Sequence, residues 1–76
     1  MEKIKTAVIG AGFISRIHLD AWKRLPNVEV KAIVDVEEER AKKYAEMFGI
    51  PEFFTDYTKV IEDPEIDIID VCTPTY

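Results

Sequence analysis

Apolar and polar positions along this chain follow two different periods, and the change from one to the other predicts its elements. Short apolar runs such as Ala7-Val8-Ile9 are typical of buried strands, whereas apolar residues three and four apart, as in residues 41–48, predict an amphipathic helix. The predicted strands are residues 3–9, 28–34, 52–55 and 66–71, and the predicted helices are residues 13–25, 37–48 and 57–62. Strict alternation of strands and helices favours an α/β fold with a parallel sheet and right-handed crossovers.

Proline and glycine mark the boundaries between these elements. Pro26 cannot continue the first helix, and it biases the residue before it away from helical angles. Gly49 supplies a C-terminal cap for the second helix, and Pro51 prevents that helix from continuing. Pro64 separates the third helix from the last strand. The chain is therefore predicted to form one continuous series of strands and helices without a linker.

Composition narrows the class of protein. The chain has 76 residues, of which 47% are hydrophobic and 33% charged, and its net charge is −5. The acidic balance leaves no basic stripe for a nucleic acid, and no apolar run approaches the roughly 20 residues that span a membrane. Cys72 is the only cysteine, so neither an intrachain disulfide nor a cysteine metal cluster is predicted. With no secretory signal recognised, a cytoplasmic location is expected.

A glycine-rich segment lies between the first predicted strand and the first predicted helix. It reads Gly-Ala-Gly-Phe-Ile-Ser over residues 10–15, in the context in which dinucleotide-binding proteins carry G-x-G-x-x-G. The first glycine permits a tight turn, and the second lets the backbone approach a pyrophosphate. The helix N-terminus adds unpaired N–H groups and the positive end of a dipole. Gly10, Gly12, Phe13 and Ile14 are therefore predicted to bind a dinucleotide.

Asp35 supports the same interpretation. It directly follows the second predicted strand, about 20 residues beyond the motif, where an acid accepts hydrogen bonds from the adenosine ribose. Because its carboxylate would repel a 2′-phosphate and Val36 offers that phosphate no partner, NAD is predicted over NADP. Ser15 replaces the third glycine, whose role is close helix–strand packing, and serine is small enough for it. An S-adenosylmethionine site and an ordinary turn with a solvated acid are the alternatives.

The other residues of reactive type are interpreted as structural. His18 has no second base near it in sequence, which favours a packing residue with one hydrogen-bonded nitrogen. Cys72 is expected to fill apolar space, and Trp22 to pack at helical spacing from His18. Asp67 and Asp70, three positions apart on a strand, should face opposite sides and cannot form a carboxylate pair. No catalytic residue and no metal ligand are predicted.

Several segments resemble the N-terminal region of the Gfo/Idh/MocA oxidoreductase family, and together they span nearly the whole chain. They are Ala7-Val8-Ile9-Gly10-Ala11-Gly12, His18, Ala32-Ile33-Val34-Asp35, Phe54-Thr55-Asp56-Tyr57 and Ile66-Asp67-Ile68-Ile69-Asp70-Val71-Cys72-Thr73-Pro74. The last two are more specific at these spacings than the glycine-rich piece. The resemblance implies an NAD(P)-dependent oxidoreductase that acts on a sugar, a polyol or a related substrate. It also implies the strand order 3-2-1-4.

The resemblance further implies where the cofactor lies and which parts of the enzyme follow. Thr73 and Pro74 would line the dinucleotide crevice, and Thr75 occupies a position near the nicotinamide ribose that is often asparagine. The family's catalytic lysine, its proton-transfer residues and its substrate domain come after Tyr76. Residues 1–76 are therefore expected to form the N-terminal part of a dinucleotide-binding domain, a partial doubly wound, Rossmann-like sheet that binds NAD without catalysis.

The last predicted strand, residues 66–71, would end such a sheet with an unpaired edge. Exposed strand edges and apolar patches favour association, and a chain that buries only about 60% of its unfolded surface gains stability from a partner. A twofold homodimer built around this fourth strand is therefore expected. A self-associating structural fragment that binds no cofactor is the alternative without a nucleotide.

Overall fold

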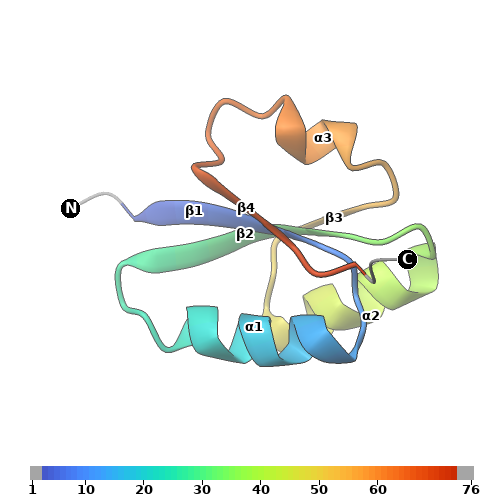
Figure 1. The fold of residues 1–76 in the computed structure, drawn as a ribbon, viewed down its shortest axis with the longest axis horizontal. Helices are drawn as coiled ribbons and strands as arrows, with labels where there is room; N and C mark the ends of the chain where they lie inside the picture. Colours follow the sequence, from blue (N-terminus) through green and yellow to red (C-terminus); the bar gives the residue numbers. More distant parts are fainter. Residues whose placement is uncertain (1–2, 74–76) are drawn as a thin grey trace.

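The computed structural model describes residues 3–73. Its elements follow the order β1 (Ile4–Ile9), α1 (Phe13–Lys23), β2 (Val28–Val34), α2 (Glu38–Phe48), β3 (Glu52–Phe54), α3 (Thr58–Ile61) and β4 (Ile68–Val71). These strands form one sheet in the order β3-β2-β1-β4, and every pairing is parallel (Figure 1). The predicted α/β fold and strand order are thus confirmed.

Two boundaries differ by two residues from the sequence-based prediction because local turns take over the backbone hydrogen bonds, and the others agree to within one residue. α1 ends at Lys23 rather than at residue 25, since the Leu25 N–H already bonds to a carbonyl three residues back. β4 begins at Ile68 rather than at residue 66, since the Ile66 N–H bonds to the Asp63 carbonyl in a turn. None of the helices in residues 3–73 is long and apolar enough to cross a bilayer.

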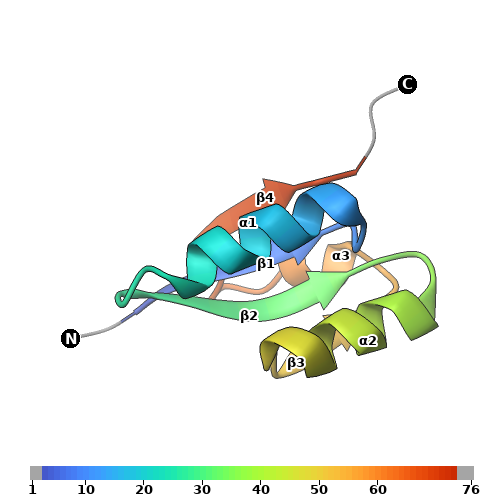
Figure 2. The same cartoon turned by 90° about the horizontal axis from the view of Figure 1, so that it is seen from below.

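The helices cover the two faces of the sheet unequally. α1 and α2 lie on one face, and the short α3 lies on the other (Figures 1 and 2). The larger apolar cluster comprises Val8, Ala11, Leu19, Val30, Ile33, Tyr44, Ala45 and Ile50. The smaller cluster comprises Ala7, Ala32, Val34 and Val60. Because a fully buried Leu or Ile side chain stabilises a fold by about 1.5–3 kcal/mol, the larger cluster contributes most of the hydrophobic stabilisation.

A β-bulge in β2 changes which residues face each cluster. Thr6 of β1 pairs with Val30, but the next residue of β1 pairs with Ala32, so Lys31 is left over. A bulge of this kind bends the strand and redirects its side chains. Val30 and Ile33 consequently belong to the same cluster although they are three positions apart, while Ala32 joins the other cluster.

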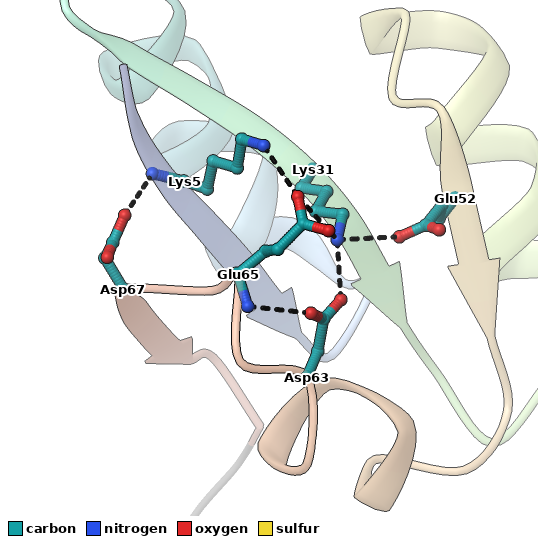
Figure 3. Close-up of polar contacts among 6 residues, drawn as sticks. All are labelled: Lys5, Lys31, Glu52, Asp63, Glu65 and Asp67. Carbon is teal, nitrogen blue, oxygen red and sulfur yellow. Dashed lines mark hydrogen bonds and ion pairs between the residues drawn. The ribbon is translucent and has the colours of Figure 1, made fainter. Parts of the chain in front are cut away.

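Lys31 ties the loop after α3 to the sheet (Figure 3). Its Nζ lies 2.6 Å from Asp63 Oδ2, 3.9 Å from Glu65 Oε1 and 4.0 Å from Glu52 Oε1. Lys5 extends this network with a bond of 2.9 Å to Glu65. The Lys31 side chain is 16% exposed, and its hydrogen bond to Asp63 raises the pKa of Lys31 and lowers the pKa of Asp63. These ion pairs therefore fix the loop that leads from α3 into β4, because α3 itself is too short to bury much apolar surface.

We expect Lys31→Met to weaken the dependence of stability on pH. The hydrogen bond from Lys31 lowers the folded pKa of Asp63 below its ordinary value of 3.8. The resulting stabilisation is complete above that ordinary value and is lost as the pH falls through the lower folded pKa. The drop in Tm between about pH 6 and about pH 2 should therefore be smaller in Lys31→Met than in the parent chain. Lys42→Met, on the exposed side of α2, is the control, and equal drops in both variants would contradict this account.

Candidate functional site

A cleft of about 490 Å³ opens where the carboxyl ends of β1 and β4 meet the N-terminus of α1. Its lining residues are Gly10, Ala11, Gly12, Phe13, Ile14, Asp35, Arg40, Val71, Cys72 and Thr73. In open parallel sheets, ligands bind beyond the carboxyl ends of the strands, at the point where the strand order reverses. The predicted site residues 10, 12–14, 35 and 73 come together here, whereas Pro74 and Thr75 lie outside the described residues.

Gly10 makes the turn at the floor of the cleft. Its φ of +101° is one that residues with a side chain rarely adopt. Its N–H donates to the Val34 carbonyl at 2.6 Å, which joins the end of β1 to β2. A Cβ at this position would lie 3.0 Å from Thr73 Cγ2 and 3.1 Å from Thr73 N. Both the backbone angle and the close approach of Thr73 therefore require glycine.

Gly12 has a different environment from Gly10. It is the N-cap of α1 with extended angles, φ −122° and ψ −164°, and no side chain caps the first turn of the helix. A Cβ at Gly12 would meet no protein atom within 4 Å. The free space and the uncapped N–H groups are what a pyrophosphate needs at a helix N-terminus.

The Gly12 carbonyl accepts three hydrogen bonds. Ser15 Oγ donates to it at 2.6 Å, Tyr44 Oη at 3.1 Å and the Arg16 N–H at 3.3 Å. Ser15 is fully buried, in agreement with the packing role predicted for it, but its hydroxyl contact does not follow from the motif. The hydrogen bond of Tyr44 was not predicted, because the apolar stripe along its helix already accounts for a tyrosine at this position.

Asp35 links the glycine turn to the start of α2. Its side chain is 10% exposed; Oδ1 accepts the Ala11 N–H at 3.0 Å, and Oδ2 accepts the Glu37 N–H at 3.0 Å. A carboxylate has about four acceptor positions, so two remain for a ribose. Arg40, which the sequence analysis did not identify, brings Nε to 3.9 Å from Asp35 Oδ2 and donates to Glu37 Oε2 at 2.6 Å. The position of Arg40 in the first turn of α2 was the available signal.

A second polar cluster lies between α1 and β4. Asp70 Oδ2 lies 2.7 Å from His18 Nδ1 and accepts the Trp22 Nε1–H at 2.8 Å, and Cys72 Sγ lies 3.4 Å from His18 Nδ1. His18 thus has one hydrogen-bonded nitrogen, as predicted, from a partner far away in sequence. Trp22 packs on the larger apolar cluster as predicted, and in addition its indole donates a hydrogen bond. Asp67 accepts the backbone N–H of Lys5 elsewhere, so the two aspartates do not pair.

The pKa values of this cluster oppose nucleophilic chemistry. Burial, together with the nearby charge of Asp70, raises the pKa of the Cys72 thiol to about 11. A thiol with this pKa is protonated at neutral pH and is a weak nucleophile. Burial also acts to raise the pKa of Asp70, but the hydrogen bonds from His18 and Trp22 outweigh it, so the pKa is lowered. The cluster therefore holds α1 against β4 through a charged, hydrogen-bonded carboxylate.

The fold and the cleft together define a dinucleotide-binding domain of the Rossmann class. The chain belongs to the Gfo/Idh/MocA family, described as an oxidoreductase family with an NAD-binding Rossmann fold, and the family's sequence profile matches residues 4–76. The resemblance noted in the sequence is thereby confirmed.

Three relatives illustrate the similarity. YrbE, an uncharacterized oxidoreductase of Bacillus subtilis (strain 168), is 38% identical over 97% of this chain and 22% of its own length. Myo-inositol 2-dehydrogenase of Thermotoga maritima is 35% identical over 95% of this chain and 22% of its own. The structure of a levoglucosan dehydrogenase in complex with NADH matches with a TM-score of 0.92 and 26% identity, over 99% of this chain and 22% of its own. The chain thus spans about a fifth of the length of these relatives.

We expect alanine to affect stability differently at the two glycines of the turn. Gly10→Ala combines a positive φ with contacts of 3.0–3.1 Å and should lower the free energy of unfolding by about 1–3 kcal/mol. Gly12→Ala puts its methyl group into open space and should lower it by less than about 1 kcal/mol. Urea unfolding followed by circular dichroism measures both values. Similar losses in the two variants would refute the separate roles assigned to them.

Proposed function

We propose that residues 1–76 are the N-terminal part of an NAD-binding domain, in an oxidoreductase that acts on a sugar, a polyol or a related substrate. The observation that carries the proposal is the open space at Gly12 beside the uncapped first turn of α1. The names of two relatives, myo-inositol 2-dehydrogenase and D-apiose dehydrogenase, support the substrate class. A levoglucosan dehydrogenase of the same fold holds NADH, which supports the cofactor.

The predicted site residues would contact different parts of the dinucleotide. The first-turn N–H groups of Phe13 and Ile14 donate to the pyrophosphate, and Asp35 accepts hydrogen bonds from the adenosine ribose. Thr73 lines the cleft, and a contact of Pro74 and Thr75 with the cofactor, outside the described residues, stays part of the proposal. NAD, when bound, would supply the hydride chemistry, and residues 1–76 would bind and orient it without supplying the catalytic base.

Calorimetric titration of the chain with NAD and with S-adenosylmethionine tests the cofactor. We expect saturable NAD binding that weakens at least about tenfold in Gly12→Ala, because the added methyl group occupies the space of the pyrophosphate. Tighter binding of S-adenosylmethionine than of NAD would replace the proposed function with a methyl-donor site. If the chain binds neither ligand, the alternative is a structural fragment that self-associates and binds no cofactor.

We expect the chain to bind NAD at least about tenfold more tightly than NADP. A 2′-phosphate beside the Asp35 carboxylate is repelled by about 1 kcal/mol per charge pair in water and by about 4 kcal/mol in a partly screened site. The preference should disappear in Asp35→Ser and persist in Val36→Ala, whose side chain is exposed beside the acid. Calorimetry with both cofactors measures the ratio, and equal affinities in the parent chain would refute the role of Asp35.

We also propose a twofold homodimer formed through β4. Within the described residues β4 pairs only with β1, and the Val71 side chain near its end is 61% exposed. A second copy of the chain would pair with the N–H and C=O groups at the open edge of β4 and would cover the exposed Val71 side chain. Sedimentation at micromolar concentration should give a dimer that Ile69→Lys dissociates and Ile61→Lys, on the exposed side of α3, does not. A stably folded monomer would refute the dimer, and a dimer that survives Ile69→Lys would locate the interface elsewhere.

A further inference from the structure

The hydroxyl of Tyr44 donates to the Gly12 carbonyl beside the cleft, a contact that neither the motif nor the fold requires. We propose that Tyr44 is a positioning residue for the pyrophosphate: together with Ser15, it holds and polarises the peptide unit between Gly12 and Phe13. The proposal rests on the dinucleotide binding proposed above and names the part of the ligand that these hydroxyls serve.

The two hydroxyls reach the Gly12 carbonyl from different elements. A serine that bonds to a carbonyl three residues earlier is common in helices, so the contact of Ser15 would mean little alone. Tyr44 approaches from α2, 32 positions along the chain, at 3.1 Å. Tyr44 is 9% exposed as a residue, and its ring packs near Phe48, with ring centroids 6.0 Å apart. The hydroxyl is therefore held in place by the core rather than free to choose among solvent partners.

The hydroxyls also compete with the helix for the same carbonyl. The first backbone hydrogen bond of α1, from the Arg16 N–H to the Gly12 carbonyl, is 3.3 Å long, while both hydroxyl contacts are shorter. A carbonyl oxygen offers two lone pairs, so three donors share them unequally. The two hydroxyls therefore help to set the orientation of this peptide plane alongside the helix, and the contact of Ser15 is the shortest of the three.

Orientation and polarisation both act on the N–H group at the other end of that peptide. Hydrogen bonds in series polarise one another, strengthening each by about 10–30%. Donors on the Gly12 carbonyl therefore make the Phe13 N–H a stronger donor to an anion. No acidic residue in the first turn of α1 and no capping side chain competes for that group. The stronger donor would therefore increase the affinity for the phosphates of the ligand. It would leave the binding of the adenosine, which Asp35 would hold, unchanged.

Tyr44→Phe tests this role because it removes the hydroxyl and keeps the ring in the core. We expect the Kd values for NAD and for ADP to rise about threefold, with the Kd for adenosine unchanged. Without ligand, the amide proton of Phe13 should move upfield in a ¹H–¹⁵N spectrum as its peptide loses polarisation. Tyr57→Phe, at an exposed tyrosine before α3, is the matched control and should change none of these values.

The outcomes separate this role from a purely structural one. Equal losses of affinity for ADP and adenosine would mean that the hydroxyl only supports the fold, and an unchanged Kd for ADP would mean that it does not serve the phosphates; either result overturns the proposal. If the parent chain binds neither NAD nor ADP, the proposed function fails, and the Phe13 amide shift still decides whether Tyr44 polarises this peptide. If Tyr44→Phe does not fold, Ser15→Ala undergoes the same measurements with the same expected pattern.

Discussion

The architecture depends on the close approach of Gly10 to the segment that follows β4. This glycine bonds to the end of β2 through its N–H and faces the backbone of Thr73, so three strands meet at one residue without a side chain. With a Cβ in that place, the carboxyl ends of β1 and β4 would have to separate, and the cleft between them would lose its floor. The position of α1 follows from the same turn, because the helix begins as soon as the chain leaves it.

The sequence predicts the framework well because local signals and the global fold agree. Apolar runs, helix stops such as Pro26 and the glycine-rich turn each have one straightforward structural interpretation, and the observed order of elements follows from them. The glycine turn at Gly10 and Gly12 and the acid at Asp35 could be predicted equally well, because the chemistry of the motif explains why each residue type is needed.

Side-chain hydrogen bonds between distant elements were not predictable in the same way. Asp70 meets His18 and Trp22 across about 50 positions, and nothing near any of these residues signals the contact. Tyr44 fits an apolar stripe so well that its polar atom drew no attention, and the bulge at Lys31 depends on the register between two strands. Hydrophobic periodicity indicates which face of a helix or strand is buried. These hydrogen bonds depend instead on single atoms that come together only in the folded chain.

The carboxylate of Asp35 has a consequence for how a protein of this kind can change its cofactor. One oxygen accepts a hydrogen bond from the glycine turn and the other accepts one from the start of α2, so the group proposed to bind the ribose also braces the cleft. A replacement without an acceptor leaves the Ala11 and Glu37 N–H groups to find new partners; water can reach the exposed Glu37 N–H, whereas a buried N–H without an acceptor is unfavourable by about 1–3 kcal/mol, which bears on the part-buried Ala11 N–H. A change of cofactor choice at this position would therefore also affect the folding of the glycine turn, most of all at the Ala11 N–H.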